Sequence, residues 1–327
     1  MSTELNLNSA LTQYALNTKL PFLARLVNEG HTLEFATIQP NVKYKDFINV
    51  VSADGNFQYG GVCAGADSQA TTSSFESREL LACKKTMFDS VCMNNVETYY
   101  NGLFPAGNVD SVEAVDTIVN PLMETALSHF QKQVEVDLWN KAGATQCGGT
   151  DGLYSYISGS TTGVRYSGSA DFTWQGGVAV ATPTKANILS QVNSLYLNAS
   201  DDATQKADLA CIMSTANFRT YLVALAESTA TALGGYEVKQ TANGALSYVK
   251  HPTIPNLTIF GTVGLAGSGR IVIGSYSDIV VGTDLASDAT DYQLWYDIND
   301  DAIKYRISAK FGANIANPTQ WISNDIA

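Results

Sequence analysis

Recognisable catalytic constellations are scarce in this chain of 327 residues. His31, His129 and His251 are the only histidines, and none stands in an HExxH pattern. Neither the GxSxG sequence of hydrolases nor a Walker loop for nucleotide phosphates occurs. His129 falls in a helical pattern but off its apolar stripe, which predicts a partly buried or surface imidazole. A hydrolase that uses aspartate or serine residues without a recognisable motif stays open, but we predict a structural protein with no catalytic residue.

Two further strings could form ligand-binding loops. The glycine-rich string GLAGSGR (264–270) follows a strand-like segment, but the segment after it, RIVIG, is again strand-like. No helix N-terminus is then available to hold a phosphate, so a turn is predicted. The acidic string DINDD (297–301) lacks the glycine at the sixth position and the closing glutamate of a calcium loop, which predicts a solvated turn. We therefore expect neither a metal ion nor a cofactor.

Cysteine usage and charge narrow the class of protein further. The five cysteines are odd in number and show no CxxC spacing, which predicts free buried thiols in a reducing compartment: Cys63, Cys83, Cys92, Cys147 and Cys211. The chain has 19 basic against 31 acidic residues, a net charge of −12, and no cluster of Lys or Arg. Binding to a phosphate backbone needs the opposite sign. No run is long enough to span a bilayer, and residues 1–10 lack the regions of a secretory signal.

The longest regular pattern predicts a helix over residues 120–143, NPLMETALSHFQKQVEVDLWNKAG. Asn120 is a suitable N-cap, Pro121 suits the first helical position, and Gly143 can adopt the left-handed conformation that ends a helix. Apolar residues recur at intervals of three and four and form one stripe along the helix: Met123, Leu127, Phe130, Val134 and Leu138. This stripe needs a sheet to cover it.

An extended hairpin is predicted before this helix. Three segments are strand-like: TLEFATI (32–38), VKYKDFINVV (42–51) and LLACKKTMFDSVCM (80–93). Between the second and third of these segments, residues 55–77 are rich in Gly, Ser and Thr and contain few large apolar residues to bury. A hairpin over residues 47–82 has too few large apolar residues to be stable alone in water. It is either partly disordered or lies across another chain, with three candidate contact residues: Phe57, Tyr59 and Phe75.

Residues 1–31 form a mostly polar arm with one or two short helices in this interpretation. Its apolar side chains have no obvious partner within the chain: Leu11, Tyr14, Phe22 and Leu23. A surface for them could belong to a neighbouring subunit.

The rest of the chain mixes helical and strand-like segments, and its total length predicts two lobes. A second helix opens at Thr182–Pro183 with one apolar face: Ile188, Val192, Leu195 and Tyr196. The run LACIMS (209–214) is short enough to be a buried strand, and Ser214 can cap a third helix. That helix carries Phe218, Tyr221, Leu222 and Leu225. The segments that follow are strand-like: YEVKQ, LSYVK, NLTIFGTV, RIVIG, DIVVG, YQLWYDI and AIKYRISAKF.

This order of parts resembles the major capsid proteins of tailed phages, whose fold is named after bacteriophage Hong Kong 97. Three strings carry the likeness: VEVDLWNKAG (134–143), LACIMSTANFRTYLVAL (209–225) and RIVIGSYSDIVVG (270–282). The resemblance implies an α+β fold of five parts: an N-terminal arm (1–31), an extended hairpin loop with its base strands (32–98), a peripheral domain with the spine helix (99–148), an axial domain (149–270) and return strands to the peripheral domain (271–327).

The resemblance also implies a function without catalysis. The chain would be a subunit of a virion capsid, assembled in the host cytoplasm from hexamers and pentamers of itself. Scaffolding, portal or decoration proteins would be further partners, and the shell would enclose double-stranded DNA without sequence-specific binding and without a membrane. Some members of the family form a Lys–Asn crosslink from a lysine on the hairpin loop, but residues 47–82 contain no lysine. An encapsulin-like compartment and a phage tail or filament protein are the alternatives.

Overall fold

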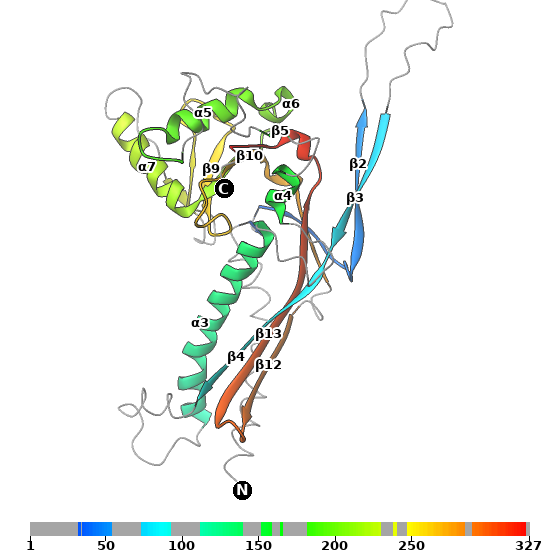
Figure 1. Ribbon diagram of the computed structural model, residues 1–327, viewed down its shortest axis with the longest axis vertical. Coiled ribbons are helices and arrows are strands. Elements are labelled where there is room, and N and C mark those ends of the chain that lie inside the picture. Colours follow the sequence, from blue (N-terminus) through cyan, green and yellow to red (C-terminus); the bar gives the residue numbers. More distant parts are fainter. Residues whose placement is uncertain are drawn as a thin grey trace, which may run out of the picture.

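The computed structural model describes residues 32–33, 35–53, 73–92, 112–139, 152–158, 164–165, 182–229, 238–240, 247–284 and 290–324. Within these residues the strands form sheets of five, seven and two strands. Figure 1 shows a long helix beside three long strands, a lobe of shorter elements at one end of it, and a hairpin that projects from the body. This arrangement is the α+β fold that we predicted.

The long helix is α3 (Val112–Trp139). It begins at Val112, so the prediction that Asn120 caps it and that Pro121 takes its first position was wrong. Proline fixes φ near the helical value, so a helix can continue through Pro121 with the loss of one backbone hydrogen bond. The predicted end at Gly143 lies outside the described residues.

The predicted apolar stripe of α3 is confirmed, because Leu127, Phe130, Val134 and Leu138 are buried. The side chain of Met123 lies outside the described residues. The stripe packs on the five-stranded sheet, whose order is β1 (Thr37–Gln39), β11 (Ile279–Thr283), β13 (Ala302–Ile315) and β12 (Thr290–Asp297), with β4 (Cys83–Cys92) along the other edge of β13. We call this sheet the spine sheet.

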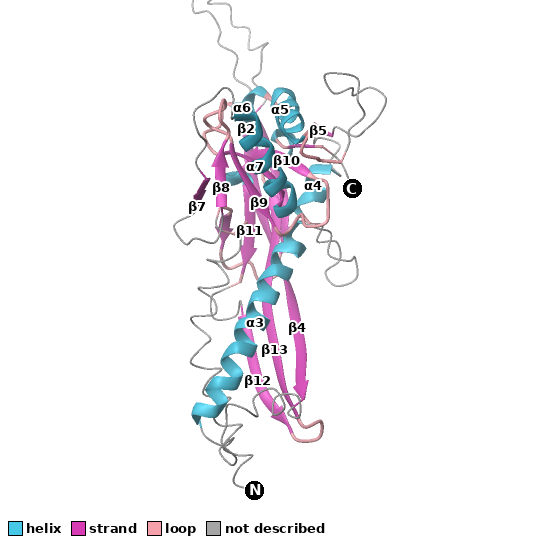
Figure 2. Cartoon of the chain, turned by 90° about the vertical axis from the view of Figure 1, so that its left-hand side faces the viewer, coloured by secondary structure: helices cyan, strands magenta, loops and turns pink. Residues whose placement is uncertain are grey.

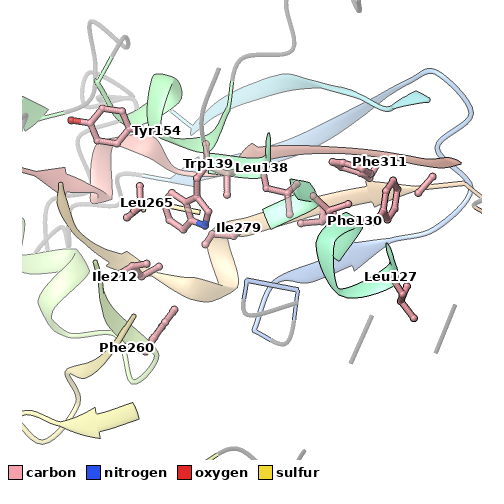
Figure 3. Close-up of a cluster of buried hydrophobic side chains, with 14 of the residues drawn as sticks. Leu127, Phe130, Leu138, Trp139, Tyr154, Ile212, Phe260, Leu265, Ile279 and Phe311 are labelled. Carbon is pink, nitrogen blue, oxygen red and sulfur yellow. The ribbon is translucent and has the colours of Figure 1, made fainter. Parts of the chain in front are cut away.

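The central strand of the spine sheet, β13, alternates apolar and basic residues. Its inward side chains join the core under α3: Ile303, Tyr305, Ile307, Ala309 and Phe311. Its outward side chains include Lys304, Arg306 and Lys310. This period of two is the pattern of a strand with one covered face. Figure 3 shows Phe311 beside Phe130 and Leu138 of α3 in this core.

The predicted hairpin is confirmed as a pair of antiparallel strands, β2 (Lys45–Ala53) and β3 (Ser73–Leu81). Strand β3 begins at Ser73, inside the run that the sequence pattern assigned to the loop. A small core holds the root of the hairpin: Val42, Ile48, Leu80, Ala82 and Val280. Only Ala82 separates β3 from β4, so the hairpin continues directly into the spine sheet. Gly312 of β13 permits this crossing, since a Cβ there would lie 1.7 Å from the Leu81 carbonyl oxygen.

The lobe is built on the seven-stranded sheet. Its strands run in the order β5 (Val164–Arg165), β14 (Ile322–Ser323), β10 (Ile271–Ser275), β6 (Leu209–Ser214), β9 (Thr258–Thr262), β8 (Ser247–Lys250) and β7 (Val238–Gln240). Two helices, α5 (Ile188–Asn198) and α7 (Thr215–Thr229), share a core with one face of this sheet. The short helices are α4 (Leu153–Ser158), α6 (Asp201–Thr204), η1 (Tyr276–Asp278) and η2 (Pro318–Gln320). The strands predicted after residue 235 are all present.

Strand β6 is buried along its whole length, as its continuous apolar run predicted. Leu209, Cys211 and Met213 face α5 and α7, whereas Ala210 and Ile212 join the core that contains Trp139 of α3. The lobe sheet is therefore covered on both faces, and its second face is shared with the spine helix.

The predicted start of α7 is confirmed, because the Ser214 hydroxyl accepts a hydrogen bond from the Asn217 N–H at 3.2 Å. The start of α5 differs from the prediction. Thr182–Asn187 precede the helix, and the Asn187 side chain accepts from the Thr184 N–H at 2.6 Å. The Asn187 N–H donates to the Thr184 carbonyl at 3.1 Å, so a hydrogen-bonded turn precedes α5, which begins at Ile188.

Among the described cysteines, only Cys211 matches the prediction of free buried thiols, and Cys63 and Cys147 lie outside the described residues. The Cys211 thiol is free and fully buried, and burial raises its pKa. Cys92 is free but exposed at the end of β4. Cys83 is disulfide-bonded, and its partner lies outside the described residues.

Candidate functional site

A buried carboxylate near the C-terminal end of α3 joins three distant segments of the chain. Glu135 is 4% exposed and lies beside the apolar stripe. Its carboxylate accepts hydrogen bonds from the Thr32 N–H at 3.0 Å, from the Thr32 hydroxyl, and from the Thr262 hydroxyl at 2.6 Å. A buried charge is costly unless it is hydrogen-bonded, and these donors compensate it. Thr32 follows residues 1–31 and Thr262 ends β9, so Glu135 connects the end of the predicted arm, the spine helix and the lobe.

Trp139 completes this junction, four residues after Glu135 on the same side of α3. The indole is fully buried, and its Nε1 donates to the Thr32 hydroxyl at 2.7 Å. In Figure 3, Trp139 lies between Leu265 and Ile279. Gly264 is required here, because a Cβ would lie 2.1 Å from Cδ1 of the indole. We call Thr32, Glu135, Trp139, Thr262 and Gly264 the spine junction.

The glycine-rich string that contains Gly264 is a turn, as predicted. The Ala266 N–H donates to the Val263 carbonyl at 2.9 Å, and Gly267 has a φ of +76°, in the left-handed region. The string thus positions the strands β9 and β10 and packs on Trp139. The turn was predictable from the glycines of this string, whereas its packing on Trp139 was not.

A second carboxylate on α3 holds the helix to the edge of the spine sheet. Asp137 pairs with Lys85 of β4 at 2.8 Å, and the ammonium group lies 5.1 Å from the centre of the Phe311 ring. Both side chains are partly exposed, so the pair contributes orientation more than stability. The two acidic residues of the VEVDLW string therefore have separate roles, one buried and one at the surface.

A polar cluster joins the lobe to the spine sheet at η1. Burial disfavours the ionised form of Asp208, but hydrogen bonds from the hydroxyls of Ser275 and Ser277 outweigh it and lower the pKa of this carboxyl. Next to it, Asp278 pairs with Lys206 at 2.9 Å. Thr37 of β1 donates to the Ser277 carbonyl at 3.1 Å. The cluster connects the two sheets through side-chain contacts.

The contact residues predicted from sequence are not placed by the structure. Six lie outside the described residues: Leu11, Tyr14, Phe22, Leu23, Phe57 and Tyr59. Phe75 belongs to β3, where its backbone pairs with Val51, but its side chain lies outside the described residues. The described root of the hairpin exposes two other aromatic residues, Tyr44 and Phe47. Their positions in a strand-like segment did not indicate which face of the strand would be exposed to solvent.

Two of the features considered for chemistry lie at the surface, whereas His251 is buried and His31 lies outside the described residues. His129 is exposed on α3. DINDD forms the exposed turn between β12 and β13, where Asp297 and Asp300 pair with Lys304. Within the described ranges, no group of three or more His, Cys, Asp or Glu side chains could hold a metal ion. No helix among them is long and apolar enough to cross a membrane.

Comparison with known proteins identifies the fold. No family model matches the sequence, and no curated protein matches it. Solved capsid structures do match. The satellite phage P4 procapsid, which includes the size determination (Sid) protein, aligns with a TM-score of 0.56 at 10% identity, over 95% of this chain and 89% of that one. The capsid of Myoviridae phage XM1 gives a TM-score of 0.53 at 14% identity, over 90% of each chain. Mycobacterium phage Bobi gives 0.52 at 12% identity, over 88% and 84%.

The chain therefore has the Hong Kong 97-type capsid fold of tailed phages, as the resemblance implied.

Proposed function

We propose that this chain is the major capsid protein of a tailed double-stranded DNA bacteriophage. The observation that carries the proposal is the likeness to phage capsid structures over 90% or more of the chain. The role is structural and involves no catalysis. Copies assemble as hexamers and pentamers into an icosahedral shell in the host cytoplasm, with scaffolding, portal or decoration proteins as further partners.

In this proposal, the five parts expected from the sequence have separate roles in the shell, with boundaries near residues 31, 98, 148 and 270. The arm and the hairpin contact neighbouring copies, through Leu11, Tyr14, Phe22 and Leu23 in the arm and Phe57, Tyr59 and Phe75 in the hairpin. Support comes from the hairpin itself, because an isolated pair of strands is only marginally stable in water. Neighbouring copies would bury both parts and offset the entropy lost when they become ordered. The net charge of −12 suits a container that encloses DNA without binding it tightly.

Electron microscopy of the purified chain tests this function. Closed icosahedral particles are expected, because the fold is that of shell subunits. Tubes would overturn the proposal in favour of a tail or filament protein, and particles that copurify with an enzyme cargo would indicate an encapsulin-like compartment. Particles formed in an infected host should contain double-stranded DNA that nuclease reaches only after the shell is disrupted.

A further inference from the structure

The outer face of the spine sheet, the side turned away from α3, carries two neighbouring aromatic residues, of which Phe88 is exposed and Trp295 is half-buried. Figure 2 shows α3 lying across one face of β4, β13 and β12. On that inner face, Met87 and Val91 of β4 and Leu294 of β12 join the core. Phe88 and Trp295 alternate with these residues and so lie on the outer face. Phe88 is 56% exposed.

The two rings meet across β13 beside an arginine. Phe88 pairs in register with Arg306, and Trp295 pairs with Lys304. The ring centroids of Phe88 and Trp295 lie 5.9 Å apart with an interplanar angle of 37°. Because residues directly opposite in an antiparallel pair share a face, the Arg306 side chain lies on the outer face next to Phe88. We call Phe88, Trp295 and Arg306 the outer cluster.

Arg306 differs from its basic neighbours in its electrostatic surroundings. Lys304 pairs with Asp297 at 2.7 Å and also with Asp300, and Lys310 pairs with Asp284 at 2.9 Å. In the part of the chain that the structure describes, no acidic side chain pairs with Arg306, and its Nε is buried without a hydrogen-bond acceptor. The side chain as a whole remains partly exposed. A partly exposed guanidinium without an ionic partner among the described residues of its own subunit is available to a carboxylate from outside it.

We infer that the outer cluster is a docking site for a second copy of this chain, in which a carboxylate of that copy pairs with Arg306. The inference rests on the proposed function, because a shell places every copy against others. Charge complementarity favours this occupant, since each copy carries 31 acidic against 19 basic residues. Arginine binds carboxylates through paired hydrogen bonds, and arginine with aromatic residues is the usual composition of an interface hot spot. Covering Phe88 and Trp295 would exclude water from that ion pair and strengthen it.

Charge reversal at Arg306 tests this docking site. In Arg306→Glu, the new carboxylate would repel the partner's acidic group, so the subunit concentration at half-assembly is expected to rise about tenfold or more, as for an interface hot spot. Phe88→Ser, which removes an exposed ring, should raise it in the same direction. The matched control is Lys132→Glu, the same charge change at an exposed position of α3, on the opposite side of the layer. The melting temperature of the unassembled subunits should match the wild type in all three variants.

A photocrosslinking residue at position 88 in an otherwise unchanged chain identifies the occupant independently of folding effects. The expected product is a covalent dimer that forms in particles and not in dilute subunits, with the crosslink next to an Asp or Glu. A crosslink only to nucleic acid or to a different protein overturns the inference, as does normal assembly of Arg306→Glu. Either result leaves the proposed function intact if the wild type still forms closed shells, whereas failure of the wild type to form them contradicts the proposed function itself.

Discussion

At the scale of single residues, two polar side chains buried next to apolar cores define how this subunit is held together. Glu135 accepts hydrogen bonds from segments 103 and 127 residues away in sequence. His251 links the loop after β8 to helix α5 through Asn193. Each group is stabilised only by its particular partners, so a small chemical change at either position should be measurable.

Replacing Glu135 by Gln should destabilise the subunit by about 1–3 kcal/mol, the cost of leaving buried donors unsatisfied. The shape is kept, but the NH2 group that replaces Oε2 cannot accept from the Thr32 N–H, and the neutral amide oxygen in place of Oε1 accepts more weakly than a carboxylate oxygen. Urea unfolding of unassembled subunits measures this change. Glu124→Gln, at an exposed position of the same helix, is the control and should shift stability by no more than about 0.5 kcal/mol. Equal stability of both variants would contradict the role given to the spine junction.

His251 should make stability depend on pH in the mildly acidic range. Its Nε2 lies 3.0 Å from the Asn193 Oδ1, and its Nδ1 accepts from the Thr253 N–H at 3.3 Å, a pattern that fits the neutral ring. Burial lowers the pKa of His251 below its ordinary value of 6.5. The unfolded chain therefore binds this proton first as pH falls. The contribution of His251 is fully present above about pH 6.5 and is lost as pH falls through the lowered pKa.

The measurement is the unfolding free energy of wild type and of His251→Gln between pH 7.5 and 5. The wild type should lose more stability than this variant over the interval, because the variant lacks the titrating ring. His129→Gln, which changes an exposed imidazole, should keep the wild-type slope. Parallel curves for wild type and His251→Gln would show that His251 does not titrate with unfolding.

At the scale of elements, the spine helix depends on its apolar stripe. Phe130 is 4% exposed in the core between α3 and the spine sheet, so Phe130→Ala should cost about 3–5 kcal/mol through lost burial and the cavity that remains. Lys132→Ala, exposed on the same helix, provides the baseline. Calorimetry of unassembled subunits should show a large drop in melting temperature for the first variant only. Full assembly and unchanged melting of Phe130→Ala would mean that this core contributes little.

The hairpin is expected to gain protection only when subunits assemble. Strands β2 and β3 pair with each other, and the cluster at their root is small. The hydrogen bonds between these strands should open locally in a free subunit, and their amide hydrogens should become protected from exchange when a neighbouring subunit contacts the hairpin. Hydrogen exchange of residues 45–53 and 73–81 should therefore be fast in free subunits and slow in particles. Strand β6, buried within the lobe, is the internal reference and should be protected in both states. The same slow exchange of the hairpin in both states would contradict contact with a neighbour.

Element type was predictable from sequence more reliably than element boundaries. The apolar stripe of α3, the continuous apolar run of β6 and the alternation of β13 are patterns that can be seen within one segment of the sequence, and each indicates the type of element. The start of α3 was not predictable, because proline is compatible with the first position of a helix and can also be accommodated in its interior, as Pro121 is here. A hydrogen-bonded turn over Thr184–Asn187 precedes α5, and β3 extends through a Ser-rich segment because β2 supplies the pairing.

The spine junction could not be predicted for a different reason. Glu135 and Trp139 stand four residues apart, which indicates one side of a helix, but their partners Thr32, Thr262 and Gly264 are distant in sequence. The outer cluster is similar, since Phe88 and Arg306 are brought together by strand register. Such sites depend on tertiary pairing, which no single segment encodes.

At the scale of the whole molecule, the acidic charge and the arm should together control shell closure. A net charge of −12 on each copy opposes close packing, and this repulsion weakens as salt screens it. Light scattering of subunits should therefore show more assembly as ionic strength rises from low to physiological values. Salt would also weaken the attraction between Arg306 and an acidic group, and this effect alone would reduce assembly as ionic strength rises. Net repulsion between whole subunits should dominate at long range, so a continuous fall of assembly with added salt would contradict this expectation.

Deletion of residues 1–28 should leave a folded subunit that does not close regular shells. The truncation keeps Thr32 and its hydrogen bonds to Glu135, so the spine junction and the cores of the subunit remain. What it removes is the apolar set at Leu11, Tyr14, Phe22 and Leu23, which the sequence places without partners in its own chain and which symmetric contacts between copies would bury. Melting of unassembled subunits should be unchanged, while electron microscopy should show open or irregular products. The matched control replaces only these four side chains by Ser in the full-length chain and should give the same products. Uniform icosahedral particles from the truncated chain would show that the arm is dispensable for closure.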